Sequence, residues 1–131
     1  MIQINSRSVI PIYEQIKLKI KELILKDALR EGDKLPSVRE LAYIMSVNPN
    51  TISKSYLSLE RDGLIETIIG KGTFVKLGAN SILKVQSKKI LELDIAKLLS
   101  NAKRLNLTLA EIVKMETEIF ENIQEEENGR N

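Results

Sequence analysis

The chain of 131 residues carries 20 Lys or Arg and 18 Asp or Glu, is 43% apolar and 4% aromatic, and contains neither Cys nor His. The missing Cys and His exclude disulfides, thiolate and imidazole metal ligands, and mechanisms in which His is the general base, so we expect no enzyme activity, no cofactor and no metal site. Residues 1–79 hold 12 Lys or Arg and 9 Asp or Glu, whereas residues 80–131 hold 8 and 9, which favours a polyanion partner for the N-terminal part.

The first predicted element is an amphipathic helix from Pro11 to about Lys26. Pro11 suits the first turn, where its missing N–H would be unpaired in any case. The apolar residues recur at spacings of three and four: Ile12, Ile16, Ile20, Leu23 and Ile24. The following segment, 29–36, has Gly and Pro and no period, so we predict a turn that ends in an extended residue before the proline.

A short helix is predicted to begin after Ser37. Ser37 and Glu40 form a capping box, in which the hydroxyl accepts from the third helical N–H and the Glu side chain reaches back to the cap. The predicted buried face of this helix consists of Val38, Leu41, Ala42 and Met45. A tight connection at Ser46 and Val47 leads to the next element.

A third helix is predicted from Asn48 to about Asp62. Asn48 suits the N-cap and Pro49 the first helical position. The predicted inward stripe is Ile52, Ser55, Tyr56 and Leu59. The opposite side, facing outward near the start of the helix, then consists of Asn50, Thr51, Ser53 and Lys54.

Two apolar and β-branched runs, 64–68 and 73–77, flank a glycine-rich tip at 69–72. They predict a hairpin. Gly70 and Gly72 allow positive φ and a close approach to another surface, and Lys71 makes the tip cationic.

Two more helices are predicted after residue 79. The first has an apolar stripe of Leu91, Ile95, Leu98, Ala102 and Leu105, and the second has a stripe of Ile112, Met115, Ile119 and Ile123. A second capping box, Thr108 with Glu111, begins the last helix. From about Gln124 onward the chain is charged, and we expect it to fray.

This order of elements predicts a mainly α fold with a small β-hairpin. It consists of an N-terminal winged helix-turn-helix DNA-binding domain over residues 1–78 and a short helical dimerisation or regulatory segment of two helices over residues 79–131. In such a domain the second helix of the motif enters the major groove, which requires short polar side chains on its first turns.

Residues 11–77 resemble the DNA-binding domain of the GntR family of bacterial regulators. The resemblance lies in two blocks, Gly32-Asp33-Lys34-Leu35-Pro36-Ser37-Val38-Arg39-Glu40-Leu41-Ala42 and Gly70-Lys71-Gly72-Thr73-Phe74-Val75, at this separation. The run Val47-Asn48-Pro49-Asn50-Thr51-Ile52, followed by Tyr56, is similar to the YtrA-type subgroup. The resemblance implies a DNA-binding regulator, commonly a repressor, that reads a double-stranded operator.

The resemblance also implies where DNA is bound. The residues that match the DNA-contacting positions of the family are Ser37, Arg39, Asn48, Asn50, Thr51, Ser53, Lys54, Gly70, Lys71 and Gly72. Many relatives have Arg where this chain has Lys54. Lys lacks the planar fork that grips guanine through two hydrogen bonds, so we expect Lys54 to serve phosphate more than base.

Each of these assignments has a purely structural alternative. For Arg39 the alternative is an ordinary solvent-exposed position on a short helix, and Asn48 is a helix cap before it is a DNA contact. Asn50 and Thr51 also suit an ordinary polar first turn, and Lys71 suits a solubilising charge at a hairpin tip.

Two helices are too few to enclose a typical metabolite pocket. Their stripes, Leu91 to Leu105 and Ile112 to Ile123, therefore predict a homodimer interface, the alternative being that both fold back onto their own domain. YtrA-type relatives are similarly short and dimeric. A two-fold dimer would place two recognition helices in successive major grooves, so the operator should be an inverted repeat.

Two other functions stay open from the sequence. Winged helices also serve as protein-interaction modules. A ligand-gated regulator with a small hydrophobic effector between the C-terminal helices is compatible with the sequence, although nothing in it indicates an effector. The chain opens with no charged and then apolar leader and has no apolar run of about 20 residues, so we expect a cytoplasmic protein without a membrane partner, associated with the nucleoid when bound to DNA.

Overall fold

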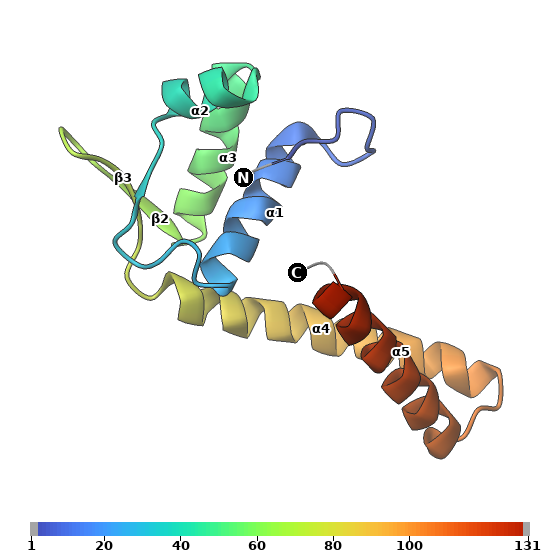
Figure 1. Ribbon diagram of the computed structural model, residues 1–131. Coiled ribbons are helices and arrows are strands. Elements are labelled where there is room, and N and C mark those ends of the chain that lie inside the picture. Colours follow the sequence, from blue (N-terminus) through green and yellow to red (C-terminus); the bar gives the residue numbers. More distant parts are fainter. Residues whose placement is uncertain (1–2, 130–131) are drawn as a thin grey trace. The chain divides into compact units, whose positions relative to one another are not determined.

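The computed structural model describes residues 3–129 (Figure 1). In chain order its elements are α1 (Ile12–Leu25), β1 (Lys34–Leu35), α2 (Val38–Met45), α3 (Pro49–Arg61), β2 (Ile65–Ile68), β3 (Gly72–Val75), α4 (Ala79–Arg104) and α5 (Leu109–Gly129). The chain divides into two compact units, residues 1–88 and 89–131, and α4 continues across the division. The mainly helical winged helix-turn-helix fold predicted from the sequence is confirmed.

The core of the first unit is formed by one face each of α1 and α3. On α1 the spacing of four brings Ile16, Ile20 and Ile24 to the same side, where each is at most 1% exposed. On α3 the predicted inward stripe of Ile52, Ser55, Tyr56 and Leu59 is buried throughout. The hydrophobic periodicity of the sequence therefore predicted correctly which sides of these two helices meet.

A left-handed residue makes the turn between α2 and α3. Ser46 ends α2 with φ of 54°, and the N–H of Val47 donates to the carbonyl of Ala42. The chain then enters α3 through Asn48 in an extended conformation, followed by Pro49 at the first helical position. This short connection holds the two helices of the motif together.

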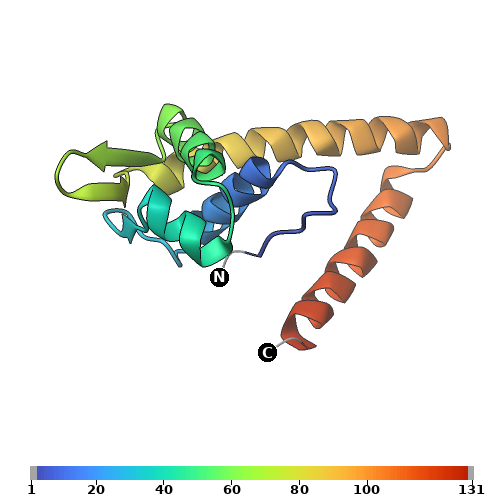
Figure 2. The same cartoon turned by 90° about the horizontal axis from the view of Figure 1, so that it is seen from above.

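The strands form an antiparallel sheet in the order β1, β3, β2. Glu66 stands opposite Phe74 and Thr67 opposite Thr73, so β2 and β3 form the predicted hairpin, which extends away from α1, α2 and α3 in Figure 2. The sequence predicted a turn that ends in an extended residue before Pro36; this is confirmed for Leu35, but it was wrong for Lys34, which is also part of the strand. β1 has only two residues and gains its partners, Phe74 and Thr73, from far along the chain, so no local pattern indicates it.

The first turns of α4 belong to the core of the first unit. Ala79 is fully buried and Leu83 is 2% exposed. The side-chain amide of Asn80 donates to the carbonyl of Ile24 over 2.9 Å and so binds the start of α4 to the end of α1. The predicted boundary after residue 78 coincides with the start of α4, whereas the compact unit extends ten residues further.

The second unit consists of the later turns of α4 and all of α5. Thr108 and Glu111 form both bonds of the predicted capping box, over 3.2 Å to the hydroxyl and 3.1 Å to the carboxylate. Helix α5 extends to Gly129, past Gln124, where the sequence predicted fraying. The Glu-rich end is made of residues with good helix propensity.

Helices α4 and α5 are 26 and 21 residues long. Charged residues interrupt both, and within residues 3–129 no helix is long and apolar enough to cross a membrane.

One side-chain hydrogen bond connects α3 to the segment before α2. The Tyr56 hydroxyl donates to the carbonyl of Pro36 over 2.6 Å. Burial, with a smaller contribution from the carboxylate of Glu40, raises the pKa of Tyr56 to about 12. The hydroxyl is therefore a donor at any ordinary pH.

We expect Tyr56→Phe to lower the free energy of unfolding by about 1 kcal/mol, because it removes this bond and leaves a carbonyl without its partner.

In the native protein Tyr56 keeps its proton up to about pH 12, whereas an unfolded Tyr loses it near pH 10. The stability that this group contributes is therefore complete below about pH 10 and is lost as the pH rises toward 12. Urea unfolding at several pH values measures both effects. Tyr43→Phe is the matched control because Tyr43 is 88% exposed, and an equal loss in both variants would contradict the assignment.

Candidate nucleic-acid interface

The start of α2 presents Ser37 and Arg39 to solvent. The Ser37 hydroxyl accepts from the N–H of Glu40 over 3.1 Å, so the cap half of the predicted box is present. Arg39 is exposed on the first turn, next to this cap. The backbone of Arg39 is therefore positioned by a capped helix start rather than by a loop, and its exposed side chain suits a contact to a phosphate or a base edge.

The start of α3 presents a polar side to solvent. Asn48 caps the helix through its side-chain oxygen, which accepts from the N–H of Asn50 over 2.8 Å. Asn48 and Asn50 are exposed, and Thr51 and Ser53 are half-buried. The amide of Asn50 is free to meet base edges, whereas the oxygen of Asn48 is already used by the cap, in agreement with its structural interpretation.

Lys54 is exposed but its direction is restrained. Its ammonium lies 3.9 Å from the centroid of the Tyr13 ring, on the first turns of α1. The buried Ser55 hydroxyl donates to the carbonyl of Tyr13 over 2.9 Å, which holds that part of α1 against α3. A cation over an aromatic face gains about 0.5–1 kcal/mol at an exposed site. Sequence reasoning missed the role of Tyr13, because the contact joins two helices about forty residues apart.

The hairpin tip carries the predicted residues Gly70, Lys71 and Gly72. Lys71 and Gly70 are exposed, and the N–H of Lys71 donates to the carbonyl of Ile68 over 3.0 Å to close the tip. Gly70 has φ of 78°, a conformation that side chains rarely adopt. The tip is therefore narrow, cationic and rich in exposed backbone.

A second cation, Lys34, reaches the hairpin from β1. A Cβ built on Gly72 would lie 2.7 Å from Cε of Lys34 and 3.5 Å from its Nζ. The missing side chain of Gly72 therefore gives the Lys34 side chain its path across the hairpin. The sequence did not single out Lys34, because its place depends on the pairing of Lys34 with Phe74 in β3.

A groove of about 340 Å³ separates the hairpin from the start of α2. It is lined by Ser37 at the start of α2, by Lys34 of β1, and by Gly70, Lys71 and Gly72 of the hairpin. Two ammonium groups and one carboxylate, that of Glu40, border it. The structure thus brings Ser37 and the hairpin tip together, while Arg39 and the predicted residues of α3 do not line this groove.

The residues predicted for dimerisation are placed unequally. Ala102 and Ile112 are buried at 8% and 7% exposure. The others are between 43% and 73% exposed: Leu91, Ile95, Leu98, Leu105, Met115, Ile119 and Ile123. Four of these exposed residues, Leu98, Leu105, Met115 and Ile119, line an apolar groove of about 220 Å³ between α4 and α5.

Comparison with known proteins gives agreeing results. The family model "Bacterial regulatory proteins, gntR family" matches residues 12–75. The HTH-type transcriptional repressor YtrA of Bacillus subtilis is 58% identical over 83 residues, which are 63% of this chain and 64% of that repressor. The chain thus spans slightly less than two thirds of the length of this relative.

Two solved structures are similar to this chain over different shares of its length. YtrA from Sulfolobus acidocaldarius, a GntR-family transcription factor, is 37% identical with a TM-score of 0.61, over 76% of this chain and 97% of that one. The structure of AraR(DBD) in complex with operator ORX1 is 31% identical with a TM-score of 0.50, over 56% and 90%.

The cap of α3 can be tested by Asn48→Ala. We expect a loss of about 1 kcal/mol in the free energy of unfolding, because the N–H of Asn50 loses its acceptor. Asn50→Ala is the matched control, since it keeps the backbone N–H and the cap, and it should change stability by less than about 0.5 kcal/mol. Chemical denaturation measures both. Equal stability of Asn48→Ala and wild type would contradict the capping role.

Proposed function

The chain belongs to the GntR family of bacterial regulatory proteins, and we propose that it is a sequence-specific DNA-binding transcription regulator that acts as a homodimeric repressor on an inverted-repeat operator. Its place of action is then the cytoplasm, on nucleoid DNA. The resemblance to YtrA-type members, predicted from residues 47–52, is confirmed by the 58% identity to the repressor of that name. These relatives are regulators rather than enzymes.

One observation carries the DNA-binding proposal. Within a winged helix-turn-helix, polar or cationic side chains are exposed at the starts of α2 and α3 and at the hairpin tip, where Ile69 is also exposed: Ser37, Arg39, Asn50, Lys54 and Lys71. These are the places where this fold meets a major groove, an adjacent backbone and a minor groove. A module that docks proteins would more often expose an apolar patch there.

The division of labour among these residues follows from their chemistry. Asn50 offers an amide that can bond to adenine through two hydrogen bonds, and Arg39 offers a fork that suits guanine or phosphate. Lys54, with its ammonium steadied over Tyr13, is a point charge and suits a phosphate. Lys71 and Lys34 add charge to the hairpin, whose glycines allow backbone to approach a narrow groove.

The apolar surface of the second unit supports a homodimer. Its exposed stripe residues lie on two helices, and four of them line one groove. A second copy offers the same stripes in a self-complementary arrangement about a two-fold axis. We therefore assign the exposed residues of both stripes to the dimer interface, and Ala102 and Ile112 to the packing of α4 against α5.

The repressor assignment is supported by the name of the relative in Bacillus subtilis and by a steric argument. The described residues form a winged helix-turn-helix and two further helices. A dimer bound across a promoter excludes polymerase without any further contact.

Selection of bound duplexes from a random DNA pool at near-physiological salt tests the whole proposal. We expect enrichment of one inverted repeat with half-sites about one helical turn apart, because a two-fold dimer presents two equivalent reading helices. Sequencing the bound fraction gives the result. No enrichment by a folded protein would contradict sequence-specific binding, and enrichment of a single, non-repeated site would contradict the dimer.

The contact assignment is tested by Arg39→Ala combined with Lys71→Ala on the selected fragment. We expect weaker binding and a shallower dependence of log Kd on log salt, by roughly 1 for each lost phosphate contact. The matched control removes the same charge from the second unit, Lys97→Ala with Lys103→Ala. A slope that changes equally in both double variants would reject the assignment, and thermal melts confirm that both remain folded.

The dimer interface is tested by Met115→Glu. Met115 is 49% exposed and lines the groove between α4 and α5, so a carboxylate there should be buried at the interface at high cost. We expect sedimentation to show a shift to the monomer, together with loss of affinity for the inverted repeat but not of helical content. Lys114→Glu is the matched control on the neighbouring exposed position. A dimer that survives Met115→Glu would place the interface elsewhere.

A further inference from the structure

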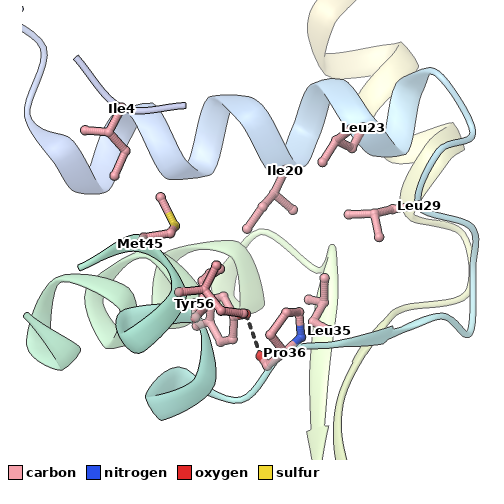
Figure 3. A pocket seen from close by; sticks show the side chains of 10 residues that line it. Ile4, Ile20, Leu23, Leu29, Leu35, Pro36, Met45 and Tyr56 are labelled. Atoms are coloured by element: carbon pink, nitrogen blue, oxygen red, sulfur yellow. Dashed lines mark hydrogen bonds between the residues drawn. The ribbon is translucent and has the colours of Figure 1, made fainter. Parts of the chain in front are cut away.

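A cavity of about 500 Å³ lies inside the winged-helix unit (Figure 3). It is bordered by α1, by the end of α2, by Tyr56 of α3 and by the segment that leads through β1 to α2. A space of this size falls in the range of about 300–1,000 Å³ that is typical of small-molecule sites.

The floor of the cavity is buried and its rim is accessible. Ile20, Leu35 and Tyr56 are between 1% and 6% exposed, and they belong to the main core. Leu23 and Met45 at the rim are half-buried. Figure 3 shows these side chains converging on one space from both sides. The cavity is therefore a preformed hollow with an opening, rather than a flat apolar surface.

The chemistry of the lining selects a class of ligand. All ten lining residues are apolar except Tyr56, and none carries a charge. The hydroxyl of Tyr56, the one polar side-chain group among these ten residues, donates to the carbonyl of Pro36 over 2.6 Å. A charged or strongly polar ligand would lose its hydration without finding a partner. A neutral, apolar molecule would lose nothing of that kind.

The rim on the N-terminal side is held by one side chain. Gln15 donates to the carbonyls of Asn5 and Ile10 over 2.8 Å each, and its side-chain oxygen accepts from the N–H of Asn5 over 2.8 Å. These bonds place Ile4 at the cavity. The segment is secured by exposed hydrogen bonds rather than by deep packing, so it can open locally at modest cost.

We propose that this cavity binds one small, neutral, apolar molecule, and that the bound molecule changes the affinity of the winged helix for DNA. The second half rests on the proposed function. It follows from position, since Met45 ends the helix before the turn and Tyr56 belongs to the helix that reads DNA. A ligand that contacts both biases their relative packing, and a ligand shifts an equilibrium only through such differential contacts.

This site differs from the effector site left open by the sequence, between the C-terminal helices. The groove there measures about 220 Å³, less than half of the cavity in the first unit. The chain offers a direct way to tell the two apart, because its three methionines include Met45 at the cavity and Met115 at the groove.

The experiment is a titration of the full chain, labelled with ¹³C at the methionine methyl groups, with the neutral dye 1-aminoanthracene. We expect a saturable shift of the Met45 signal by the ring current of the bound dye. A shift of the Met115 signal alone would overturn the proposal. A Met45 signal that does not move at saturating dye would also overturn it, because the cavity would then be filled by a second copy or by another part of the chain.

A pair of variants on α1 gives the control. Leu23→Trp inserts a large ring into the cavity and should weaken dye binding roughly tenfold or more, because ring and dye compete for one volume. Leu18→Trp adds the same ring to α1 at a residue that is 52% exposed and outside the lining, and it should bind dye like the wild type. Equal binding by all three chains would overturn the assignment. The wild-type Met45 shift stands as a test even if Leu23→Trp fails to fold.

The effect on DNA is measured separately, with the selected operator fragment in the presence and absence of saturating dye. We expect a change in Kd of roughly fivefold or more in the wild type and none in Leu23→Trp. A Met45 shift without any change in the Kd for DNA would overturn the coupling to DNA binding, while the assignment of the ligand site would stand. A protein that binds no DNA at all would overturn the proposed function and the coupling together, while the Met45 signal still decides the site.

Discussion

Ile52 and Leu59 of α3 are fully buried in the same core as Ile16 and Ile20 of α1, and this packing decides which residues of α3 face solvent. A helix repeats every 3.6 residues, so fixing its inward side over two turns also fixes its outward side. Asn50 is therefore exposed where the fold needs a polar reading surface. The polar edge proposed to bind DNA is thus a consequence of an apolar contact on the other side of the same helix.

Two hydrogen bonds make that packing specific. The Ser55 hydroxyl, fully buried, donates to the carbonyl of Tyr13, and the Tyr56 hydroxyl donates to the carbonyl of Pro36. Apolar contacts alone tolerate small rotations of a helix, whereas a buried polar group that loses its partner is costly. Neighbouring residues of α3 therefore hold it against α1 on one side and against the start of α2 on the other. As a result, α3 is common to the proposed DNA surface and to the proposed cavity.

The sequence predicted those features that depend on local chemistry. The cap at Asn48, the stripe of α3 and the hairpin around Gly70 all follow from residue type and spacing within a few positions, and the structure has them. What it missed depends on contacts between distant segments. Strand β1 exists because Lys34 meets Phe74, and no period in a two-residue strand indicates that. The cation–π contact of Lys54 with Tyr13 likewise arises only when α1 and α3 pack. The cavity beside Met45 also depends on packing, because the spacing of residues in the sequence does not report the volume left between helices.

The two units use their apolar residues differently, and this difference links assembly to DNA binding. In the second unit only Ala102 and Ile112 are buried among the described residues of the two stripes, while residues such as Leu91 and Ile119 remain more than half exposed. Two helices of this size bury too little surface to be stable alone. In the proposed dimer, a second copy supplies the missing surface, so the core of this unit would be completed by association and would depend on protein concentration. On the proposed inverted repeat, only the associated form would present two reading helices at once, so the completed C-terminal core and the occupied operator would stabilise each other.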